Sequence, residues 1–581
     1  MSGSADWIEL PAGEAGDAIV SALAMGGVEV LFFTSGSEIC FYQESIAKAR
    51  AHGRPAPRLI TVTHEHANLN AALGYAAVSG KPAATAVHVD AGTLHHGGAI
   101  HTAMHASLPV VITAGLPPTS YPGTSPAARN AGGHLWLQET FDQHGIVRQY
   151  VKWDRRLNQH DNPGMIVSRA LQVARSEPCG PVYLTVAPEV SMQKLPATSF
   201  PSADQLGIPR PPALDAASAG EIAERLVRAK APRVVVSASG RNPGAVPALV
   251  ELCELLGLPV VHAKTRCYLS FPLDHPLMLT DGDLSGADAV LVLEADVPWI
   301  PGPTAPGKGA WVAAVGLDPV RQKFPTYEFT ADLRATADPC LAIQAITAAA
   351  RGVLRPEDEG RMAERARATA EVTRKRRDAL ESEARAKAGD AVVHPLWLGS
   401  QIGRIVGDDA IVFDDTLPYH RLNEFLRCRR PGSYFFTPGT TGGWAPGAAF
   451  GAKLAAPERD VIAVTGDGFY MFATANAALW SAAHYGAPFL TVVYQNRSYG
   501  TGTVRAAQFY PGGYAEKAGF DGGYFDPPID FAKEAEACGA YGENVREPAA
   551  LEGALKRGLA EVRKGRPAVV AVWMARHLQK D

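Results

Sequence analysis

The pattern of apolar and polar positions alternates short apolar runs with longer stretches rich in Ala and Leu. In the last third of the chain, the runs at 461–465 and 489–493 are β-branched and uninterrupted, as is typical of strands buried on both faces. The stretch 473–486 between them has Ala and Leu at helical spacing, stops at Gly486 and is followed by Pro488. The pattern therefore predicts a strand–helix–strand unit with parallel strands.

The same alternation predicts three α/β domains with parallel sheets. The first domain covers 1–190, the second 214–350 and the third 390–581. A proline-rich stretch at 191–215 predicts a linker between the first two. The segment 351–389 is dense in charge and in good helix formers, so we expect a solvated connecting helix. The first and third domains are similar in rhythm, although no short repeat is evident.

Composition and charge narrow the classes of protein to consider. The chain has 581 residues, 46% hydrophobic and 20% charged, which is an ordinary globular composition and too long for one core. The formal net charge is −4 and no basic tract stands out, which argues against nucleic acid as the main partner. No apolar run approaches the roughly 18 residues of a membrane span, and no secretory signal is recognisable. Seven scattered cysteines without a CxxC pair lead us to expect a cytoplasmic protein.

Candidate chemistry lies at the ends of the two strands described first. Asp467 stands between two glycines just after the first strand, and Asn496 just after the second. Parallel neighbouring strands end at one edge of a sheet, where open α/β sheets bind ligands, so we expect the two side chains to meet. Two hard oxygen ligands suit Mg²⁺ holding a phosphate. Taken singly, a capping Asp and a turn Asn are the commoner explanation.

The spacing of this pair resembles the cofactor motif of the thiamine diphosphate-dependent enzymes. Here Gly-Asp-Gly is followed by 26 intervening residues, 469–494, and then by Gln495 and Asn496. The stretches PGSYFF, GAAFGAKLAAPERDVIAVTGDG, ALWSAAHYGAP and NRSYG resemble the branch with benzoylformate decarboxylase, acetolactate synthase and pyruvate oxidase. The three-domain layout is similar over essentially the full length. The resemblance implies a pyrimidine-binding first domain, a central domain and a diphosphate-binding last domain.

The resemblance assigns most cofactor contacts to the last domain. It implies that Asp467, Asn496 and the backbone carbonyl of Ser498 bind Mg²⁺ together with diphosphate oxygens. Relatives place a bulky apolar residue beneath the cofactor to hold it in a V shape, and that position falls on Gly442, or on Trp444 if the alignment shifts. The further contacts that the resemblance implies are Asp415, Thr416, Thr441, Gly442, Trp444, Gly466, Gly468, Phe469 and Tyr499.

In the first domain, Glu65 stands where a predicted strand ends and a helix opens. Alone, a glutamate there is most often a favourable charge in the first turn. By resemblance, Glu65 matches the glutamate that hydrogen-bonds the cofactor's aminopyrimidine and promotes the imino form that deprotonates the thiazolium carbon. In that family the glutamate comes from the neighbouring subunit. The resemblance therefore implies a homodimer or homotetramer with active sites at the subunit interface.

Three more residues resemble active-site residues of benzoylformate decarboxylases. His88 and Ser37 match a histidine and a serine there, and an imidazole at His88 could carry the proton that follows loss of CO₂. The alternative for His88, a strand histidine bonded to backbone, stays open. His275 resembles a second histidine, but similar text occurs in relatives with other chemistry. His95 stands where many relatives have Asn and either faces the substrate or packs.

Two further sequence patterns give weaker indications of a functional site. His101 and His105 are spaced i, i+4 on a predicted helix, but no third ligand is evident, so zinc is the weaker reading. The stretch 302–309 nearly matches a phosphate-binding loop, but Gly309 replaces the hydroxyl that would bind Mg²⁺, and prolines remove backbone donors. We predict a surface loop there.

We therefore expect an enzyme that uses thiamine diphosphate and Mg²⁺ to make or break a carbon–carbon bond next to a carbonyl. The preferred reaction is non-oxidative decarboxylation of a 2-oxo acid, with carboligation close behind. Acetolactate-synthase-like condensation and a 2-hydroxyacyl-CoA lyase acting on a 2-hydroxyacyl substrate are the nearest alternatives. A flavin oxidoreductase is disfavoured because the middle domain of this chain has no convincing dinucleotide-binding fingerprint. A non-catalytic homologue is disfavoured by intact Glu65, Asp467 and Asn496.

Overall fold

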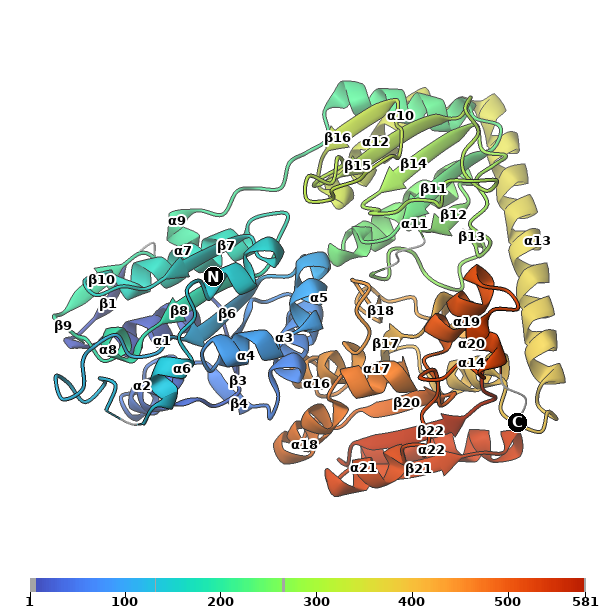
Figure 1. Ribbon diagram of the computed structural model, residues 1–581. Helices are drawn as coiled ribbons and strands as arrows, with labels where there is room; N and C mark the ends of the chain where they lie inside the picture. Colours follow the sequence, from blue (N-terminus) through green and yellow to red (C-terminus); the bar gives the residue numbers. More distant parts are fainter. Residues whose placement is uncertain (1–6, 131, 264–266, 579–581) are drawn as a thin grey trace.

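A computed structural model describes residues 7–130, 132–263 and 267–578 (Figure 1). Three six-stranded sheets form three lobes, and every strand pairing within these sheets is parallel. The expected fold class, three α/β domains with parallel sheets, is confirmed. Among the helices of the described residues, none has both the length and the apolar character needed to cross a bilayer.

The sheet of the first domain has the strand order β4-β3-β5-β6-β8-β7. The chain moves from β3 to one side to form β4 and then returns to the other side for β5, so the order reverses next to β3. Its strands are β3 (Val30–Phe33), β4 (Arg58–Thr61), β5 (Ala83–Val87), β6 (Val110–Gly115), β7 (Trp153–Arg156) and β8 (Val182–Val186). Its helices are α1 (Ala15–Met25), α2 (Phe41–Ala51), α3 (Glu65–Ser79), α4 (Asp90–His95), α5 (Gly98–Ala106), α6 (His134–Leu137), α7 (Pro163–Arg175), α8 (Pro188–Ser191) and α9 (Ala203–Leu206).

The sheet of the last domain has the order β18-β17-β19-β20-β22-β21, which is the same order when strands are numbered from each domain's first strand. The similar rhythm of the two sequences thus reflects a shared topology. Its strands are β17 (Ile411–Asp415), β18 (Tyr434–Phe436), β19 (Val461–Gly466), β20 (Leu490–Gln495), β21 (Tyr541–Val545) and β22 (Ala568–Trp573). Its helices are α14 (Pro395–Ile405), α15 (Leu422–Phe425), α16 (Ala445–Ala455), α17 (Asp467–Phe472), α18 (Ala475–Tyr485), α19 (Gly500–Phe509), α20 (Tyr514–Lys517), α21 (Phe531–Ala537) and α22 (Leu551–Arg563).

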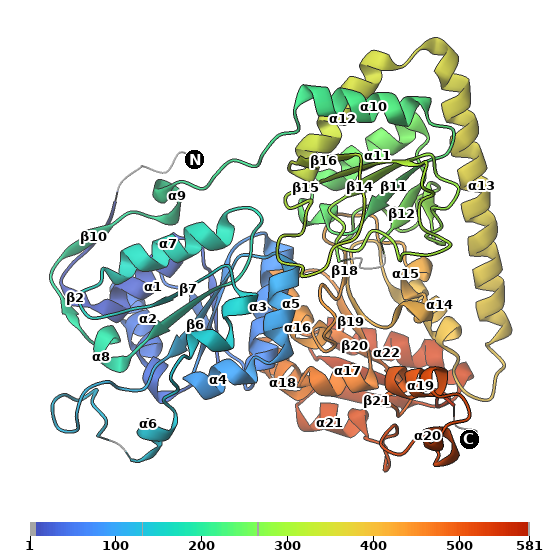
Figure 2. The same ribbon diagram turned by 45° about the horizontal axis from the view of Figure 1, so that its top comes forward.

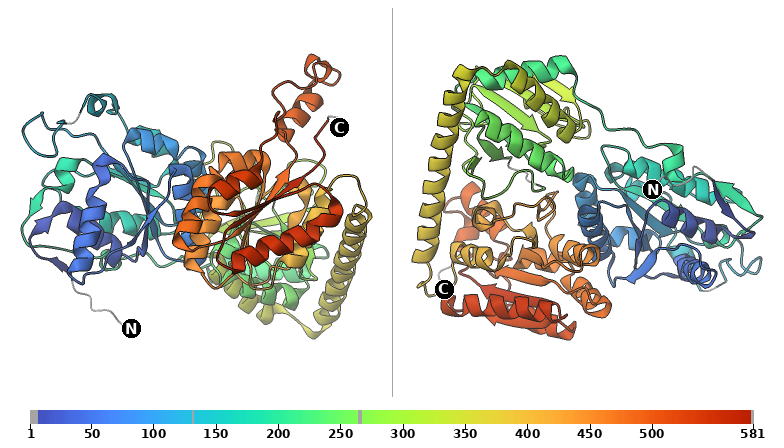
Figure 3. Two further views of the ribbon diagram at one scale, coloured as in Figure 1. Left: turned by 90° about the horizontal axis from the view of Figure 1, so that it is seen from below. Right: turned by 180° about the vertical axis from the view of Figure 1, so that it is seen from behind.

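The middle domain has the strand order β13-β12-β11-β14-β15-β16. Its long charged helix, predicted from composition, runs along the outside of the middle and last domains (Figure 3). The strands are β11 (Pro232–Val236), β12 (Val260–His262), β13 (Met278–Leu279), β14 (Ala289–Leu293), β15 (Trp311–Gly316) and β16 (Leu333–Thr336). The helices are α10 (Ala216–Arg228), α11 (Ala245–Leu256), α12 (Pro339–Val353) and α13 (Pro356–Ala386).

The first and last domains share one hydrophobic core, which runs from the helices on one sheet to the helices on the other. Helices α3 and α16 meet at its centre through glycines. A Cβ atom on Gly74 would lie 2.0 Å from the carbonyl oxygen of Ala448, and one on Gly451 would lie 1.9 Å from that of Ala71. Backbone thus packs on backbone, so the glycines fix the relative position of the two sheets.

Two details differ from the sequence-based expectation. The segment expected as a linker contains β9 (Lys194–Leu195) and β10 (Thr198–Phe200), which pair with β2 (Gly13–Glu14) and β1 (Ile8–Leu10). The stretch 207–215 has neither helix nor strand, and it crosses to the middle domain as an extended connection (Figure 2). The stretch after the first strand of the strand–helix–strand unit forms two helices, α17 and α18, separated by Thr474 with φ 47°.

Candidate functional site

A cavity of about 160 Å³ lies at the carboxyl ends of β17, β19 and β20 in the last domain. This is the edge where the strand order reverses, because β17 lies between β18 and β19. None of the described residues of the first or middle domain lines it. The lining residues are Asp415, Thr416, Leu417, Tyr419, His420, Gly466, Asp467, Gly468, Phe469, Phe472, Tyr494, Asn496, Ser498, Tyr499, Gly500, Thr501 and Gly502.

Asp467 and Asn496 line this cavity from neighbouring strand ends, as the parallel pairing predicts. Asp467 accepts hydrogen bonds from the backbone N–H of Gly468 at 2.8 Å and of Arg497 at 2.5 Å, so its carboxylate joins the two strand ends. The side-chain oxygen of Asn496 accepts from the N–H and the hydroxyl of Ser498, each at 2.8 Å. The oxygens of both side chains are held at the cavity.

Asp415 ends β17 and is fully buried. Its Oδ2 accepts a hydrogen bond from the N–H of Gly443 at 2.7 Å, whereas its buried Oδ1 has no hydrogen-bond partner in the described part of the chain. Burial raises the pKa of Asp415 to about 7, although backbone hydrogen bonds oppose the shift. Burial likewise raises the pKa of Asp467 to about 7. Burial therefore favours the protonated form of both carboxyl groups by raising each pKa, although the charge and backbone N–H of Arg497 oppose the shift at Asp467.

The donor set of the cavity fits a divalent cation and a phosphate group. Carboxylate and amide oxygens are the ligands that Mg²⁺ prefers, and a bound cation would return the pKa of Asp467 towards its ordinary range. His420 lines the same cavity, stacks on Tyr494 with ring centroids 4.6 Å apart, and has a buried Nδ1 without a partner among the described residues. Burial lowers the pKa of His420 to about 3, so this imidazole is neutral and able to donate one hydrogen bond to an anion.

Nine of the cofactor contacts expected from the resemblance line the cavity, and four do not. Trp444 packs in the core against Phe413 with only 2% of its surface exposed, so it does not face the cavity. At Gly442 a Cβ atom would lie 2.1 Å from the ring of Phe469, which does line the cavity. Phe469 thus fills the space of the side chain absent at Gly442. Thr441 lies 3.4 Å from the ring of His101 instead.

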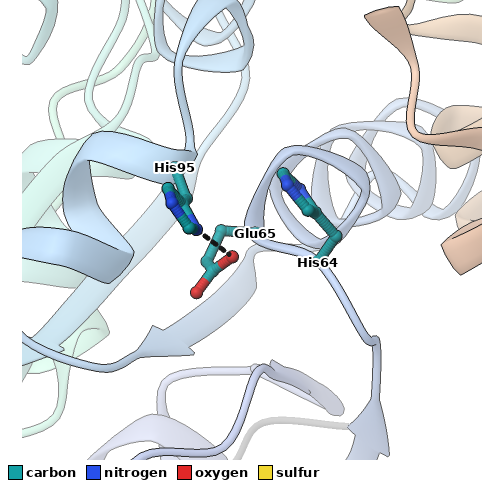
Figure 4. Close-up of side chains that lie close together, drawn as sticks. All are labelled: His64, Glu65 and His95. Atoms are coloured by element: carbon teal, nitrogen blue, oxygen red, sulfur yellow. Dashed lines mark ion pairs between the residues drawn. The ribbon is translucent and has the colours of Figure 1, made fainter. Parts of the chain in front are cut away.

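Glu65 opens α3 in the first domain and is 8% exposed. The Nδ1 of His95 lies 3.4 Å from its Oε2, and the rings of His64 and His95 are parallel with centroids 5.5 Å apart (Figure 4). Potential ligand atoms of these three residues lie within 4.8 Å of one another. However, the Nδ1 of His64 already accepts the N–H of His66 at 3.1 Å and caps the helix, which argues against metal binding through that atom. The contact that remains is the one between His95 and Glu65, at the edge of the first sheet.

Ser37 and His88, each predicted by resemblance as an active-site residue, both contact a third residue that sequence reasoning missed. Glu38 accepts a hydrogen bond from the hydroxyl of Ser37 at 2.9 Å, and its Oε2 lies 2.7 Å from the Nδ1 of His88. Ser37 follows β3 and His88 follows the adjacent β5. Glu65 follows β4, on the other side of β3. All four residues thus lie at one edge of the sheet.

The other histidines singled out in the sequence lie elsewhere. His275 packs on Phe271, and its Nε2 lies 3.4 Å from Glu254 in the middle domain. His101 and His105 are close, with ring centroids 4.5 Å apart, but among the described residues neither belongs to a group of three potential metal ligands. The signals for the missed residues were weak: Glu38 sits beside Ser37, and His420 ends the stretch that begins at Asp414.

Comparison with known proteins identifies the family. The model of the thiamine pyrophosphate enzyme N-terminal TPP binding domain matches residues 13–146, and that of the C-terminal TPP binding domain matches 419–572. The chain is 29% identical over 536 residues to benzoylformate decarboxylase of Pseudomonas aeruginosa, covering 89% of this chain and 91% of that protein. It is 25% identical over 599 residues to sulfoacetaldehyde acetyltransferase of Alcaligenes xylosoxydans xylosoxydans, covering 97% and 93%.

A solved structure shares the fold. The thiamine diphosphate-dependent 4-hydroxybenzoylformate decarboxylase of Rhodococcus jostii RHA1 superposes with a TM-score of 0.76 at 22% identity, covering 98% of this chain and 100% of that one. With both domain models matched in the expected order, this chain belongs to the thiamine diphosphate-dependent enzymes.

Proposed function

We propose that this enzyme binds thiamine diphosphate with Mg²⁺ at the ends of β17, β19 and β20 and catalyses non-oxidative decarboxylation of a 2-oxo acid such as benzoylformate. The observation that carries the proposal is the cavity in which Asp467 and Asn496 meet beside a second buried carboxylate. The likeness to a benzoylformate decarboxylase over nine-tenths of the chain supports the choice of substrate class. Carboligation, in which the product carbon joins a second carbonyl, is the secondary activity.

The chain's own residues have separate tasks in this proposal. Asp467, Asn496 and the backbone carbonyl of Ser498 hold the cation, and the neutral imidazole of His420 donates to a diphosphate oxygen. Phe469, whose ring lies against Gly442 and lines the cavity, would supply an apolar contact to the bound cofactor. When bound, thiamine diphosphate supplies the carbon nucleophile and electron acceptor that the polypeptide lacks. Glu65 offers a carboxyl oxygen to the aminopyrimidine ring.

A second copy of the chain completes the site in this proposal. Glu65 lies on the first sheet, whereas every residue lining the cavity lies between 415 and 502. Large apolar side chains are also exposed around both regions, including Leu137 and Phe141 in the first domain and Phe472 and Tyr510 in the last. A homodimer, or a homotetramer of two such dimers, would bring the partner's first domain over the cavity and cover these surfaces.

Product analysis tests the substrate class. With thiamine diphosphate and Mg²⁺ present, we expect benzoylformate to yield benzaldehyde and CO₂, and omission of Mg²⁺ with a chelator present to stop turnover. Incubation with pyruvate alone, followed by measurement of acetolactate, tests for the competing condensation. If acetolactate forms from pyruvate as the main product while benzoylformate is left unchanged, the decarboxylase proposal is wrong.

A mixing experiment tests the shared site. Glu65→Gln and Asp467→Ala should each be inactive alone. If each site takes Glu65 from one subunit and Asp467 from the other, a mixed dimer has one intact site, and equal mixing after reversible dissociation should restore about a quarter of the wild-type activity. Glu65→Gln mixed with itself is the control. No restoration, with mixed dimers shown to form, would place each site within one chain.

Transfer to a second carbonyl or acceptor is the alternative. It is favoured by the likeness to a sulfoacetaldehyde acetyltransferase over almost the whole chain. Incubating the enzyme with sulfoacetaldehyde and phosphate, and measuring acetyl phosphate, separates the two readings. Turnover of sulfoacetaldehyde with benzoylformate inert would favour the alternative.

A further inference from the structure

Glu38 is a buried carboxylate at the centre of the first domain's candidate residues, only 3% exposed. It belongs to a short 3₁₀ turn, Ser37–Ile39, that follows β3. Three side chains from different elements converge on it. The hydroxyl of Ser37 and the Nδ1 of His88 reach Oε2 at 2.9 and 2.7 Å, and the amide of Gln138 donates to Oε1 at 2.8 Å. Both carboxylate oxygens therefore have partners.

The backbone around Glu38 is shaped to allow this arrangement. A Cβ atom on Gly36 would lie 2.5 Å from the Nδ1 of His88, and one on Gly115 would lie 2.7 Å from the Cβ of Glu38. Any larger residue at either position would push the carboxylate or the imidazole away. The contact between Glu38 and His88 is thus set by close packing rather than by flexible surface side chains.

The charges of the pair support each other. The close ion-pair contact with the Glu38 carboxylate raises the pKa of His88, although burial opposes the shift. Burial alone would raise the pKa of Glu38, but the contact with His88 and its charge, together with the hydrogen bond from Ser37, hold that pKa below its usual range. His88 keeps 27% of its side chain exposed, so the buried anion stabilises a cation that a ligand can reach.

We propose that Glu38 is a positioning residue that holds His88 through Nδ1 and keeps Nε2 as the nitrogen that gives a proton to the substrate. This inference rests on the proposed decarboxylation. The bond from the carbonyl carbon to the carboxylate breaks, CO₂ leaves, and that carbon takes the Nε2 proton of His88. His88 becomes neutral with its remaining proton on Nδ1, and water returns the lost proton. Overall, the carboxylate anion of a 2-oxo acid and one proton give an aldehyde and CO₂.

Gln138 provides the matched comparison. It follows α6 and ties the outer segment of the first domain to the other oxygen of Glu38. A purely structural role for Glu38 would be to anchor this segment, and Gln138→Ala removes that anchor but keeps the Glu38 carboxylate. Gln138 itself also raises the pKa of His88, though less than Glu38 does. Glu38→Gln removes the negative charge at nearly constant shape. The two variants therefore separate anchoring from control of His88.

The first test needs neither cofactor nor substrate. In protein labelled with ¹³C at the histidine Cε1 and assigned with His88→Gln, we expect His88 to titrate above its ordinary value. In Glu38→Gln its pKa should fall by about one unit or more, because the neighbouring charge is gone, and Gln138→Ala should change it less. An unchanged titration in Glu38→Gln would overturn the inference. If Glu38→Gln does not fold, a wild-type pKa at or below the ordinary value overturns it.

The second test uses the loaded enzyme. Glu38→Gln should lower kcat by on the order of 10²-fold, with little change in KM, and should move the basic limb of the pH profile to lower pH, because His88 must be protonated to act. Glu38→Asp should restore part of the rate. Turnover with an unmoved basic limb would overturn this inference. Absence of any 2-oxo acid turnover, with the His88 titration shifted as expected, would instead overturn the proposed function.

Discussion

The first and last domains have the same strand order but place different chemistry at the same edge. In the first sheet, Glu38 lies in the short turn after β3 and His88 directly follows the adjacent β5, and the two side chains form an acid–base pair. In the last sheet, Asp415 ends β17 and Asp467 follows the adjacent β19, and burial raises the pKa of both carboxyl groups although Arg497 partly opposes the shift at Asp467. One scaffold thus carries a close acid–base pair in one copy and two carboxyl groups of raised pKa in the other.

The difference is visible in the carboxyl groups themselves. The pKa of Glu38 is lowered because His88 compensates for burial, whereas the pKa of Asp467 is raised to about 7 because burial is not fully compensated. A buried carboxyl group with a raised pKa in a cavity is a candidate functional group. In the proposed function, the first sheet would serve proton transfer and the last would bind a cation and an anion.

The largest expected effect follows replacement of Asp467, the proposed cation ligand at the last sheet. Asp467→Ala should weaken thiamine diphosphate binding in the presence of Mg²⁺ by on the order of 10³-fold, equivalent to about 4 kcal/mol, because the cation loses a buried charged ligand. Fluorescence titration with the cofactor measures this. Asp408→Ala, an exposed residue before β17, is the control and should bind normally. Normal cofactor binding by Asp467→Ala would mean that Asp467 does not hold the cation, and the proposed difference between the two sheets would be wrong.

The next effect belongs to the first sheet. Glu65→Gln should lower kcat by on the order of 10²- to 10³-fold while the cofactor still binds, because the lost group moves a proton and holds no cation. Steady-state rates and the same binding titration measure this. His95→Ala keeps the carboxylate and should have a smaller effect. Full activity of Glu65→Gln would remove this residue from the reaction.

A third effect tests how the two sheets are held together. Gly451→Ala places a methyl group against the backbone of α3 and should destabilise the protein by about 3 kcal/mol, because neither helix can yield. Thermal unfolding monitored by circular dichroism measures the loss. Gly360→Ala in α13, where a Cβ atom has nothing within 4 Å, is the control and should not destabilise. Equal stability of both variants would mean that the helices can separate at no cost.

The smallest effect is a pH dependence. The pKa values of Asp415 and Asp467 rise from 3.8 to about 7 on folding. Between about pH 4 and about pH 7 the unfolded chain releases these protons and the folded protein keeps them, so the free energy of unfolding of the cofactor-free protein falls as the pH rises through this range. We expect a lower unfolding temperature at pH 8 than at pH 6, and a larger stabilisation by Mg²⁺ and cofactor at pH 8. Asp467→Asn should weaken this pH dependence, and an unaltered dependence would contradict the assignment.

The sequence predicted the features that depend on neighbouring residues and on strand direction. The end of α18 at Gly486, which adopts φ 63°, follows from its missing side chain. The approach of Asp467 and Asn496 follows from parallel pairing of β19 and β20. The neighbourhood of Ser37 and His88 came from resemblance, and the pairing of β3 with β5 explains it.

Features that depend on distant segments could not be predicted. Trp444 stands in a stretch that resembles a cofactor-binding one, but packing against Phe413 buries it in the core. Glu38 is held in part by a hydrogen bond from Gln138, which lies a hundred positions later in the chain. Strands β9 and β10 lie in a proline-rich stretch and form only because β2 and β1 offer them partners. In each case tertiary contacts outweigh the local pattern.

The glycine contacts between α3 and α16 also determine how this enzyme can be recombined with its relatives. The seam between the outer domains is made of backbone atoms, so no set of side-chain replacements on one helix can adapt it to a foreign partner. A chimera that imports a first domain must import the facing helix of the last domain with it. The two outer domains are therefore a single unit of exchange, although the whole middle domain separates them along the chain.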